Sequence, residues 1–166
     1  MATMSATAER GASSQARSII IAGLVIAVVG GLDQTIFAVL TQPVTLIFVF
    51  QYIASAFLGL AAFAGGYTTA LLGLLFHLVV SFVVAGVFIL AASKIAILRR
   101  TVFVSALVYG AAVNVISGVL LPFTVAPKLP VTTLVVVHGL IADALFIGLP
   151  LALTVWLAAR TRKESF

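Results

Sequence analysis

The sequence predicts an all-α polytopic membrane protein: a four-helix transmembrane bundle with one outer-side re-entrant or interfacial helix. Of its 166 residues, 63% are hydrophobic and only 8% are charged, whereas a soluble domain carries about 25% charged residues. Several apolar runs approach or exceed the roughly 20 residues that a bilayer crossing requires. The nine Lys and Arg residues stand in short clusters beside these runs, as the orientation of membrane proteins requires.

The same composition excludes several classes of function. The chain contains no cysteine, which excludes disulfides, thiolate metal sites and cysteine nucleophiles. The net charge of +5 does not indicate nucleic-acid binding, because the basic residues flank apolar runs. The sequence has no signature of a zinc protease, a P-loop protein or a serine hydrolase. We therefore expect that the protein is not an enzyme and that its surroundings are the lipid bilayer.

The first segment, residues 1–18, is rich in Ala, Ser and Thr with scattered charges, so we expect a disordered tail. The first span is predicted at about residues 19–40. Its apolar run is about twice as long as a signal-peptide core and lacks a clean cleavage site, which indicates a retained span. The Arg and Ser content of the tail leaves an organelle transit peptide as a weaker alternative.

Residues 44–64 are apolar enough for a fifth span, but the distribution of charge argues against one. With four spans, the N-terminal tail, the loop at 94–100 and the C-terminal tail at 160–166 share one side. Eight of the nine basic residues then lie on that side, and Lys128 stands alone on the other. The positive-inside rule therefore predicts that both termini are cytoplasmic. Residues 44–64 become an outer half-helix, with Gln51 and Tyr52 on its polar edge.

The remaining spans complete a single transmembrane domain over residues 19–159. We predict them at about residues 67–92, 101–121 and 131–159. Pro150 lacks an N–H group and is expected to kink the last span. Small residues at helical spacing let helices approach closely, and they form candidate packing faces on two spans. These residues are Gly66, Gly73 and Ser81 on the second span, and Gly110 and Gly118 on the third.

Both histidines and two of the four acidic residues lie inside apolar spans. An ionisable group at the bilayer centre costs about 2.5–3.5 kcal/mol, so each should face protein or water. At about 1.5 Å of rise per residue, five polar side chains fall in the middle and outer half of the membrane. This predicted polar layer consists of Asp33, His77, Asn114, His138 and Asp143.

His138 and Asp143 are five residues apart, which is about 140° around a helix, so they cannot pair with each other on a regular helix. The estimated depths make Asp33 the plausible partner of His138. Asp143, on another face of the same span, is then free to approach His77. Both pairings are hypotheses that join different spans.

Three interpretations of the polar layer remain open. Its members can hydrogen-bond one another and specify how the four helices pack. They can instead line a conduit or pocket for protons or a small ligand. Finally, His77 and His138 are the minimum for a six-coordinate b-type haem in a four-helix bundle. No other metal site or cofactor is expected.

A series of short motifs covers most of residues 30–155. The series comprises Gly31-Leu32-Asp33, Gln51-Tyr52-Ile53-Ala54-Ser55, Ala62-Phe63-Ala64-Gly65-Gly66, Thr69-Ala70, Leu72-Gly73, His77, Tyr109-Gly110, Leu121-Pro122, Ala126-Pro127, His138 and Gly148-Leu149-Pro150. In this order they resemble a family of small bacterial inner-membrane proteins with four predicted spans and no established activity. The resemblance implies a bacterial inner-membrane location.

For function, we expect a small structural or accessory subunit that packs in the membrane as a homo-oligomer or within a larger complex. The alternative is a transporter, a channel or a small-ligand-binding protein that uses the polar layer. A haem-binding electron carrier is the third interpretation. No nucleic-acid partner is expected.

Overall fold

The structure, a computed structural model, describes residues 2–120 and 132–163, with side chains for residues 13–117 and 132–160. Every element in these two stretches is helical and none is a strand, which confirms the all-α class. The elements are α1 (Ala2–Thr41), α2 (Leu46–Leu58), the 3₁₀ helix η1 (Gly59–Ala64), α3 (Gly66–Lys94), α4 (Ala96–Arg100), α5 (Val102–Leu120), α6 (Thr133–Asp143), the π-helical segment η3 (Ala144–Gly148) and α7 (Leu149–Lys163).

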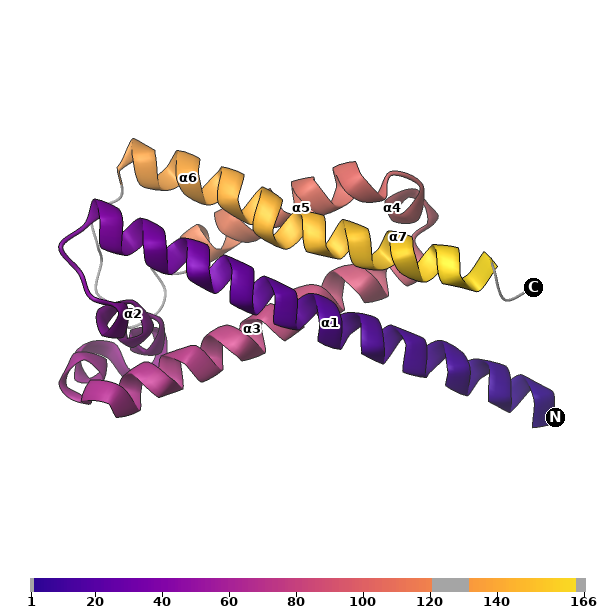
Figure 1. Ribbon diagram of the computed structural model, residues 1–166, viewed down its shortest axis with the longest axis horizontal. Helices are drawn as coiled ribbons and strands as arrows, with labels where there is room; N and C mark the ends of the chain where they lie inside the picture. Colours follow the sequence, from indigo (N-terminus) through magenta and orange to yellow (C-terminus); the bar gives the residue numbers. More distant parts are fainter. Residues whose placement is uncertain (1, 121–131, 164–166) are drawn as a thin grey trace.

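The long helices lie roughly along the long axis of the molecule, and α1 and α3 cross each other (Figure 1). α1, α3 and the continuous helix formed by α6, η3 and α7 run along the long axis of the molecule. The start of α1, the short helix α4 and the end of α7 lie at one end, which we call the basic end. The opposite end carries α2 and η1 (Figure 1). The three basic segments of the sequence therefore lie at the same end of the molecule.

Four helical stretches of the described chain are long and apolar enough to cross a membrane. They are Ser13–Thr41, Leu46–Ala64, Gly66–Lys94 and Thr133–Arg160, and a shorter apolar helix covers Val102–Ser117. The chain is thus a multi-pass helical membrane protein, but these four stretches are not the four predicted spans. The half-helix of the prediction qualifies by length, and the predicted third span corresponds to α5, Val102–Leu120, which ends at the edge of the described residues.

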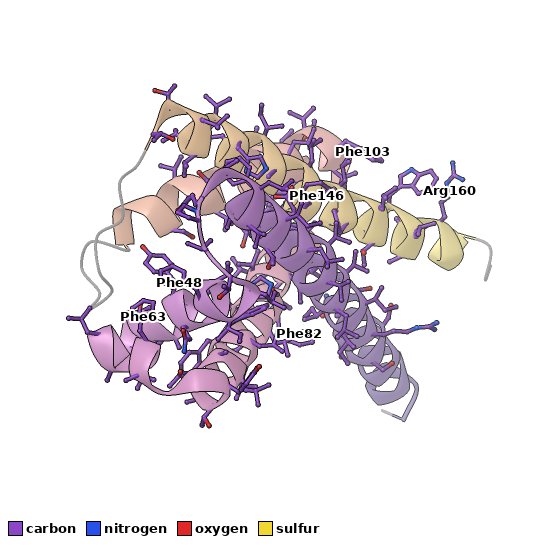
Figure 2. All side chains as sticks on the ribbon, turned by 60° about the vertical axis from the view of Figure 1, so that its left-hand side comes forward. Phe48, Phe63, Phe82, Phe103, Phe146 and Arg160 are labelled. Atoms are coloured by element: carbon purple, nitrogen blue, oxygen red, sulfur yellow. The ribbon has the colours of Figure 1, made fainter. Side chains whose placement is uncertain are left out.

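Geometry distinguishes the half-helix from the long helices. The end of α1 and the start of α3 lie at the same end of the molecule, and α2 and η1 connect them there (Figure 1). The connecting segment therefore returns to the end at which it began, as a re-entrant or interfacial helix does. Phe48 of α2 and Phe63 of η1 contact each other within it, with ring centroids 5.1 Å apart (Figure 2).

The N-terminal expectation is wrong for the residues that the structure describes. α1 begins at Ala2, so residues 2–18 continue the first span as one helix. This stretch contains no proline and several strong helix formers, including Ala, Met, Glu, Gln and Arg. Once the membrane span has nucleated the helix, each added residue gains one backbone hydrogen bond at little further cost.

The other predicted boundaries differ by a few residues. The last long helix begins at Thr133, where the Thr132 hydroxyl accepts a hydrogen bond from the backbone N–H of Val135 at 3.3 Å. The same helix continues through α7 to Lys163, so most of the predicted C-terminal tail is helical. Residues 121–131 and 164–166 of the predicted elements lie outside the described residues.

The predicted irregularity at Pro150 takes the form of a π-helical segment, η3, that ends two residues earlier. Pro150 has no N–H group to donate to the carbonyl of Phe146, so the regular α-helical ladder cannot continue through this turn. Single π-helical turns inside α-helices absorb such interruptions. The Thr154 hydroxyl donates to the Pro150 carbonyl at 2.7 Å and stabilises the turn that follows.

Two glycines shape the connection through η1. Gly59 ends α2 with φ 57° and Gly66 starts α3 with φ 55°, a left-handed conformation that favours glycine. Gly66 is exposed, and no atom lies within 4 Å of the position that a Cβ would take. The prediction that Gly66 packs against a helix is therefore wrong. Its role is to turn the backbone.

Other predicted packing residues lie at close helix contacts. A Cβ on Gly73 would overlap the carbonyl oxygen of Phe50 on α2, and a Cβ on Gly110 would overlap the carbonyl oxygen of Asp143. Ser81 is 3% exposed and donates to the carbonyl of His77 at 2.8 Å. These three predictions are confirmed. Gly118 lies on α5 but beyond the residues whose side-chain surroundings are described.

The apolar core lies in the half of the molecule nearest the basic end. Its buried members come from α1, α3, α5, η3 and α7: Ala22, Ile26, Ala85, Phe88, Ile89, Ala92, Val102, Ala106, Ile147, Leu151 and Ala152. Five of the eleven are alanines, which permits short distances between helix axes. Tyr109 of α5 donates to the carbonyl of Val84 on α3 at 2.9 Å and joins these two helices at the edge of the core.

Candidate functional site

The predicted polar layer lies between the apolar core and the end that carries α2. Its side chains come from four helices: Asp33 from α1, His77 from α3, Asn114 from α5, and both His138 and Asp143 from α6. The carboxylate of Asp143 is within electrostatic range of Asp33, His77 and His138. The structure therefore assembles the five predicted residues into one site.

The predicted pairing of His138 with Asp33 is confirmed. His138 Nε2 lies 3.4 Å from Asp33 Oδ1, and the two side chains are only 24% and 19% exposed. The contact is an ion pair when the imidazole is protonated. The pair joins α6 to α1.

The imidazole of His138 also stacks on the ring of Phe37. Their centroids are 3.7 Å apart and their planes differ by 6°. Phe37 lies four residues after Asp33 on α1, so both side chains project from the same face of that helix. Sequence reasoning missed Phe37, although its four-residue spacing from Asp33 was a usable signal. The stacking fixes the plane of the imidazole ring, and the contact with Asp33 fixes the direction of Nε2 within that plane.

Asp143 has a different hydrogen-bond partner from the one expected. Asn114 Nδ2 donates to Asp143 Oδ2 at 3.0 Å, whereas His77 lies within electrostatic range only. The cause is the close approach of the two backbones at Gly110, which brings Asn114, one turn further along α5, beside Asp143. Gly139 leaves room for the amide, since a Cβ there would lie 2.6 Å from Asn114 Nδ2.

His77 bonds to the backbone of α1. Its Nε2 lies 3.0 Å from the carbonyl oxygen of Ala27. A carbonyl oxygen only accepts, so this contact requires a proton on Nε2. Gly31, one turn further along α1, leaves space for the ring, because a Cβ there would lie 3.0 Å from the same nitrogen. His77 therefore joins α3 to α1 at a place where α1 presents no side chain.

One polar atom of the layer is left without a partner. Asp33 Oδ2 is buried and has no hydrogen-bond donor among the described residues. A buried carboxylate oxygen without a donor is costly. Asp33 is thus the member of the layer with the least complete hydrogen bonding among the described residues.

The two histidines do not fit a bis-histidine haem site in this arrangement. His77 Nε2 faces the Ala27 carbonyl oxygen and His138 Nε2 faces Asp33, so each ring presents this nitrogen to a protein oxygen instead of a shared cavity. Within the described residues, no group of three or more His, Cys, Asp or Glu side chains is placed to hold a metal ion.

The predicted outer segment holds a second polar cluster. Gln51 is not on a polar edge but is 7% exposed, and its Nε2 donates to the Gly66 carbonyl at 3.1 Å and to Thr69 Oγ1 at 3.4 Å. The Thr69 hydroxyl in turn donates to the Ala62 carbonyl at 2.5 Å. Tyr52 is half-buried, and its carbonyl accepts from the Ser55 hydroxyl at 2.6 Å.

The Gln51 cluster is structural. It gives hydrogen-bond partners to the Ala62 carbonyl of η1 and to the Gly66 carbonyl at the start of α3. Irregular backbone at membrane depth requires such partners. Sequence reasoning missed Thr69. Its spacing of four residues before Gly73 places it on the face of α3 that contacts α2.

Comparison of the chain with protein-family models, with curated proteins and with solved structures finds no match. The class of the protein therefore follows from its fold and its polar layer, without a relative for comparison. The chain is a multi-pass helical membrane protein whose helices are joined at one level by a layer of titratable and amide side chains.

Proposed function

We propose that this protein is a small structural or accessory subunit of the bacterial inner membrane, and that the polar layer holds its helices in one arrangement. The supporting observation is that each contact of the layer joins a different pair of helices. His138–Asp33 joins α6 to α1, Asn114–Asp143 joins α5 to α6, and His77 joins α3 to the backbone of α1. Hydrogen bonds between membrane helices contribute about 0.6 kcal/mol each on average, enough to select among similar packings.

The orientation that accompanies this proposal has both termini in the cytoplasm. Arg17, Lys94, Arg99, Arg100 and Arg160 belong to the segments that meet at the basic end. Basic residues beside spans are retained on the cytoplasmic side. The segment from α2 to η1 then lies toward the outer surface.

Lateral association uses the apolar faces that the bundle leaves exposed. On α3, for example, Leu71 is 65% exposed and Val83 is 58% exposed. Photo-crosslinking residues placed at these two positions in living cells should yield an adduct of one discrete mass, either a second copy or one partner. A crosslinker at Ala85, which is fully buried, is the matched control and should yield none. Recovery of only the uncrosslinked monomer from all three positions would overturn the accessory role.

A second function is favoured by one observation, the unpartnered oxygen of Asp33. Its carboxyl group lies next to His138 and within electrostatic range of Asp143, an arrangement that suits the transfer of protons through the membrane. Protein reconstituted into vesicles that contain a pH-sensitive dye would show proton flux under this proposal, and Asp33→Asn would abolish it. Equal dye responses from wild type, Asp33→Asn and empty vesicles would eliminate this second function.

A further inference from the structure

A cleft of about 410 Å³ opens at the basic end of the molecule. Its walls come from α1, α3, α5 and α7, with one residue from α4. It is separate from the polar layer, because none of the five layer residues lines it. Nothing in the proposed accessory role requires it.

The lining of the cleft is partly polar and partly apolar. Its polar lining consists of the Ser14, Gln15, Ser18, Ser93 and Arg99 side chains. Its apolar lining includes Ile89 and Val102, both of which belong to the apolar core, and Val155 beside them. A ligand that fills this cleft therefore needs a polar part and a hydrocarbon part.

Arg99 supplies the charge of the cleft. Its Nη1 donates to the Ser93 carbonyl at 3.1 Å, which anchors the guanidinium with one of its five N–H groups. The anchored group remains exposed, so its other N–H groups can reach a ligand. A guanidinium held in this way suits the recognition of a phosphate.

No described carboxylate compensates this charge. Of the acidic residues whose side chains are described, Asp33 and Asp143 both belong to the polar layer. Among the described side chains, the charge that lines the cleft is therefore only positive, which suits an anion.

Trp156 indicates the depth of the cleft in the membrane. Trp156 lines the cleft, and the Arg160 guanidinium lies 3.7 Å from its ring centroid, near the C-terminal end of α7 (Figure 2). Tryptophan and basic residues at the ends of spans are typical of the level of the lipid headgroups. The mouth of the cleft therefore opens where phospholipid phosphates are concentrated.

We infer that this cleft binds an anionic phospholipid of the leaflet at the basic end. Its phosphate contacts Arg99 and the neighbouring hydroxyl groups, and its glycerol and first acyl methylenes lie along the apolar wall. Basic pockets between membrane helices on the cytoplasmic side bind anionic headgroups by this combination of contacts. A free phosphate ion uses only the polar part of the lining.

The test measures lipid retention by native mass spectrometry after exchange of the purified protein into phosphatidylcholine, with or without phosphatidylglycerol. Wild type should retain one phosphatidylglycerol in preference to phosphatidylcholine. Arg99→Gln should weaken this preference about fivefold, the effect of one Arg near an anionic surface. Arg100→Gln is the matched control, since it removes the same charge from the adjacent exposed residue, which does not line the cleft. Equal weakening by both variants would overturn the inference in favour of diffuse surface charge.

A second variant tests the shape of the cleft without changing charge. Ser18→Leu places a larger side chain in the lining and should also reduce phosphatidylglycerol retention, with unchanged helix content by circular dichroism. A parallel arm adds inorganic phosphate to lipid-free detergent micelles and should leave the thermal transition unchanged. Stabilisation by phosphate alone equal to that by lipid, or wild-type retention of phosphatidylcholine as strong as that of phosphatidylglycerol, would overturn the proposal.

Discussion

Asp33 contacts His138 through one carboxylate oxygen, while its other oxygen is buried without a donor among the described residues. The neighbouring pairs of the layer are better satisfied, because Asp143 accepts from an amide and His77 donates to a carbonyl. The hydrogen bonding of each residue in the layer thus depends on which atoms of another helix face its side chain.

A double-mutant cycle tests the Asp33–His138 contact. Asp33→Asn and His138→Phe should each destabilise the protein, and the double variant should lose less than the sum of the two. The coupling expected for an interhelical polar contact is about 0.6 kcal/mol and at most about 1.7 kcal/mol. Unfolding in mixed micelles with increasing denaturing detergent measures it. Additive losses would show that the two side chains do not interact in the membrane.

Two adjacent glycines on α1 test the environment of His77. A Cβ at Gly31 would lie 3.0 Å from His77 Nε2, whereas a Cβ at Gly30 would meet no atom within 4 Å. Both changes to alanine raise helix propensity by up to about 1 kcal/mol. Gly31→Ala must also displace the imidazole, so we expect it to be about 1 kcal/mol less stable than Gly30→Ala. The same unfolding assay compares them, and equal stabilities would contradict the His77–Gly31 contact.

At the scale of elements, the packing of α2 on α3 depends on backbone contact at one point. The carbonyl oxygen of Phe50 occupies the place that a side chain on residue 73 would need, and Gln51 with Thr69 joins the same two helices nearby. The half-helix is therefore held by a close approach and a buried hydrogen-bond cluster, in addition to apolar contact.

Gly73→Ala should separate α2 from α3 and destabilise the protein by about 1–3 kcal/mol, the usual cost of overpacking. Gly86→Ala is the matched control on the same helix, because the nearest atom to its Cβ is Ile19 Cγ2 at an ordinary 3.9 Å. Limited proteolysis near Gly59, together with thermal unfolding, would report loosening of the half-helix. Equal behaviour of the two variants would contradict the close approach.

At the scale of the whole molecule, hydropathy and geometry select different sets of spans. Leu46–Ala64 is apolar and long enough to cross, yet the helices before and after it meet at the same end of the molecule. The basic segments gather at the opposite end. Charge and connectivity therefore favour the orientation with both termini in the cytoplasm. The lengths of the apolar helices alone do not select an orientation.

The chain has no native cysteine, so single cysteines report topology directly. Gln42→Cys and Tyr67→Cys, at the two ends of the half-helix, should both be labelled from outside the cell by a membrane-impermeant maleimide. Ala96→Cys at the basic end should be labelled only after the membrane is permeabilised. Labelling of positions 42 and 67 from opposite sides would mean that the half-helix spans the membrane and that the proposed orientation is wrong.

The sequence by itself determined the class of this protein, the members of its polar layer and the Asp33–His138 pair. Lipid tolerates few charged groups and requires satisfied backbone, so composition and helical rise are enough to find spans and to estimate depth.

Only the tertiary structure decided the partner of Asp143, the contact of His77 with α1, the turn at Gly66 and the helical start of α1. The first two depend on how far each helix is rotated and where glycines let two backbones touch. The third depends on a single backbone angle, and the fourth on a helix extending beyond its apolar run. Depth along a helix follows from residue number, but rotation about its axis and distance between axes are set by the side chains that meet there.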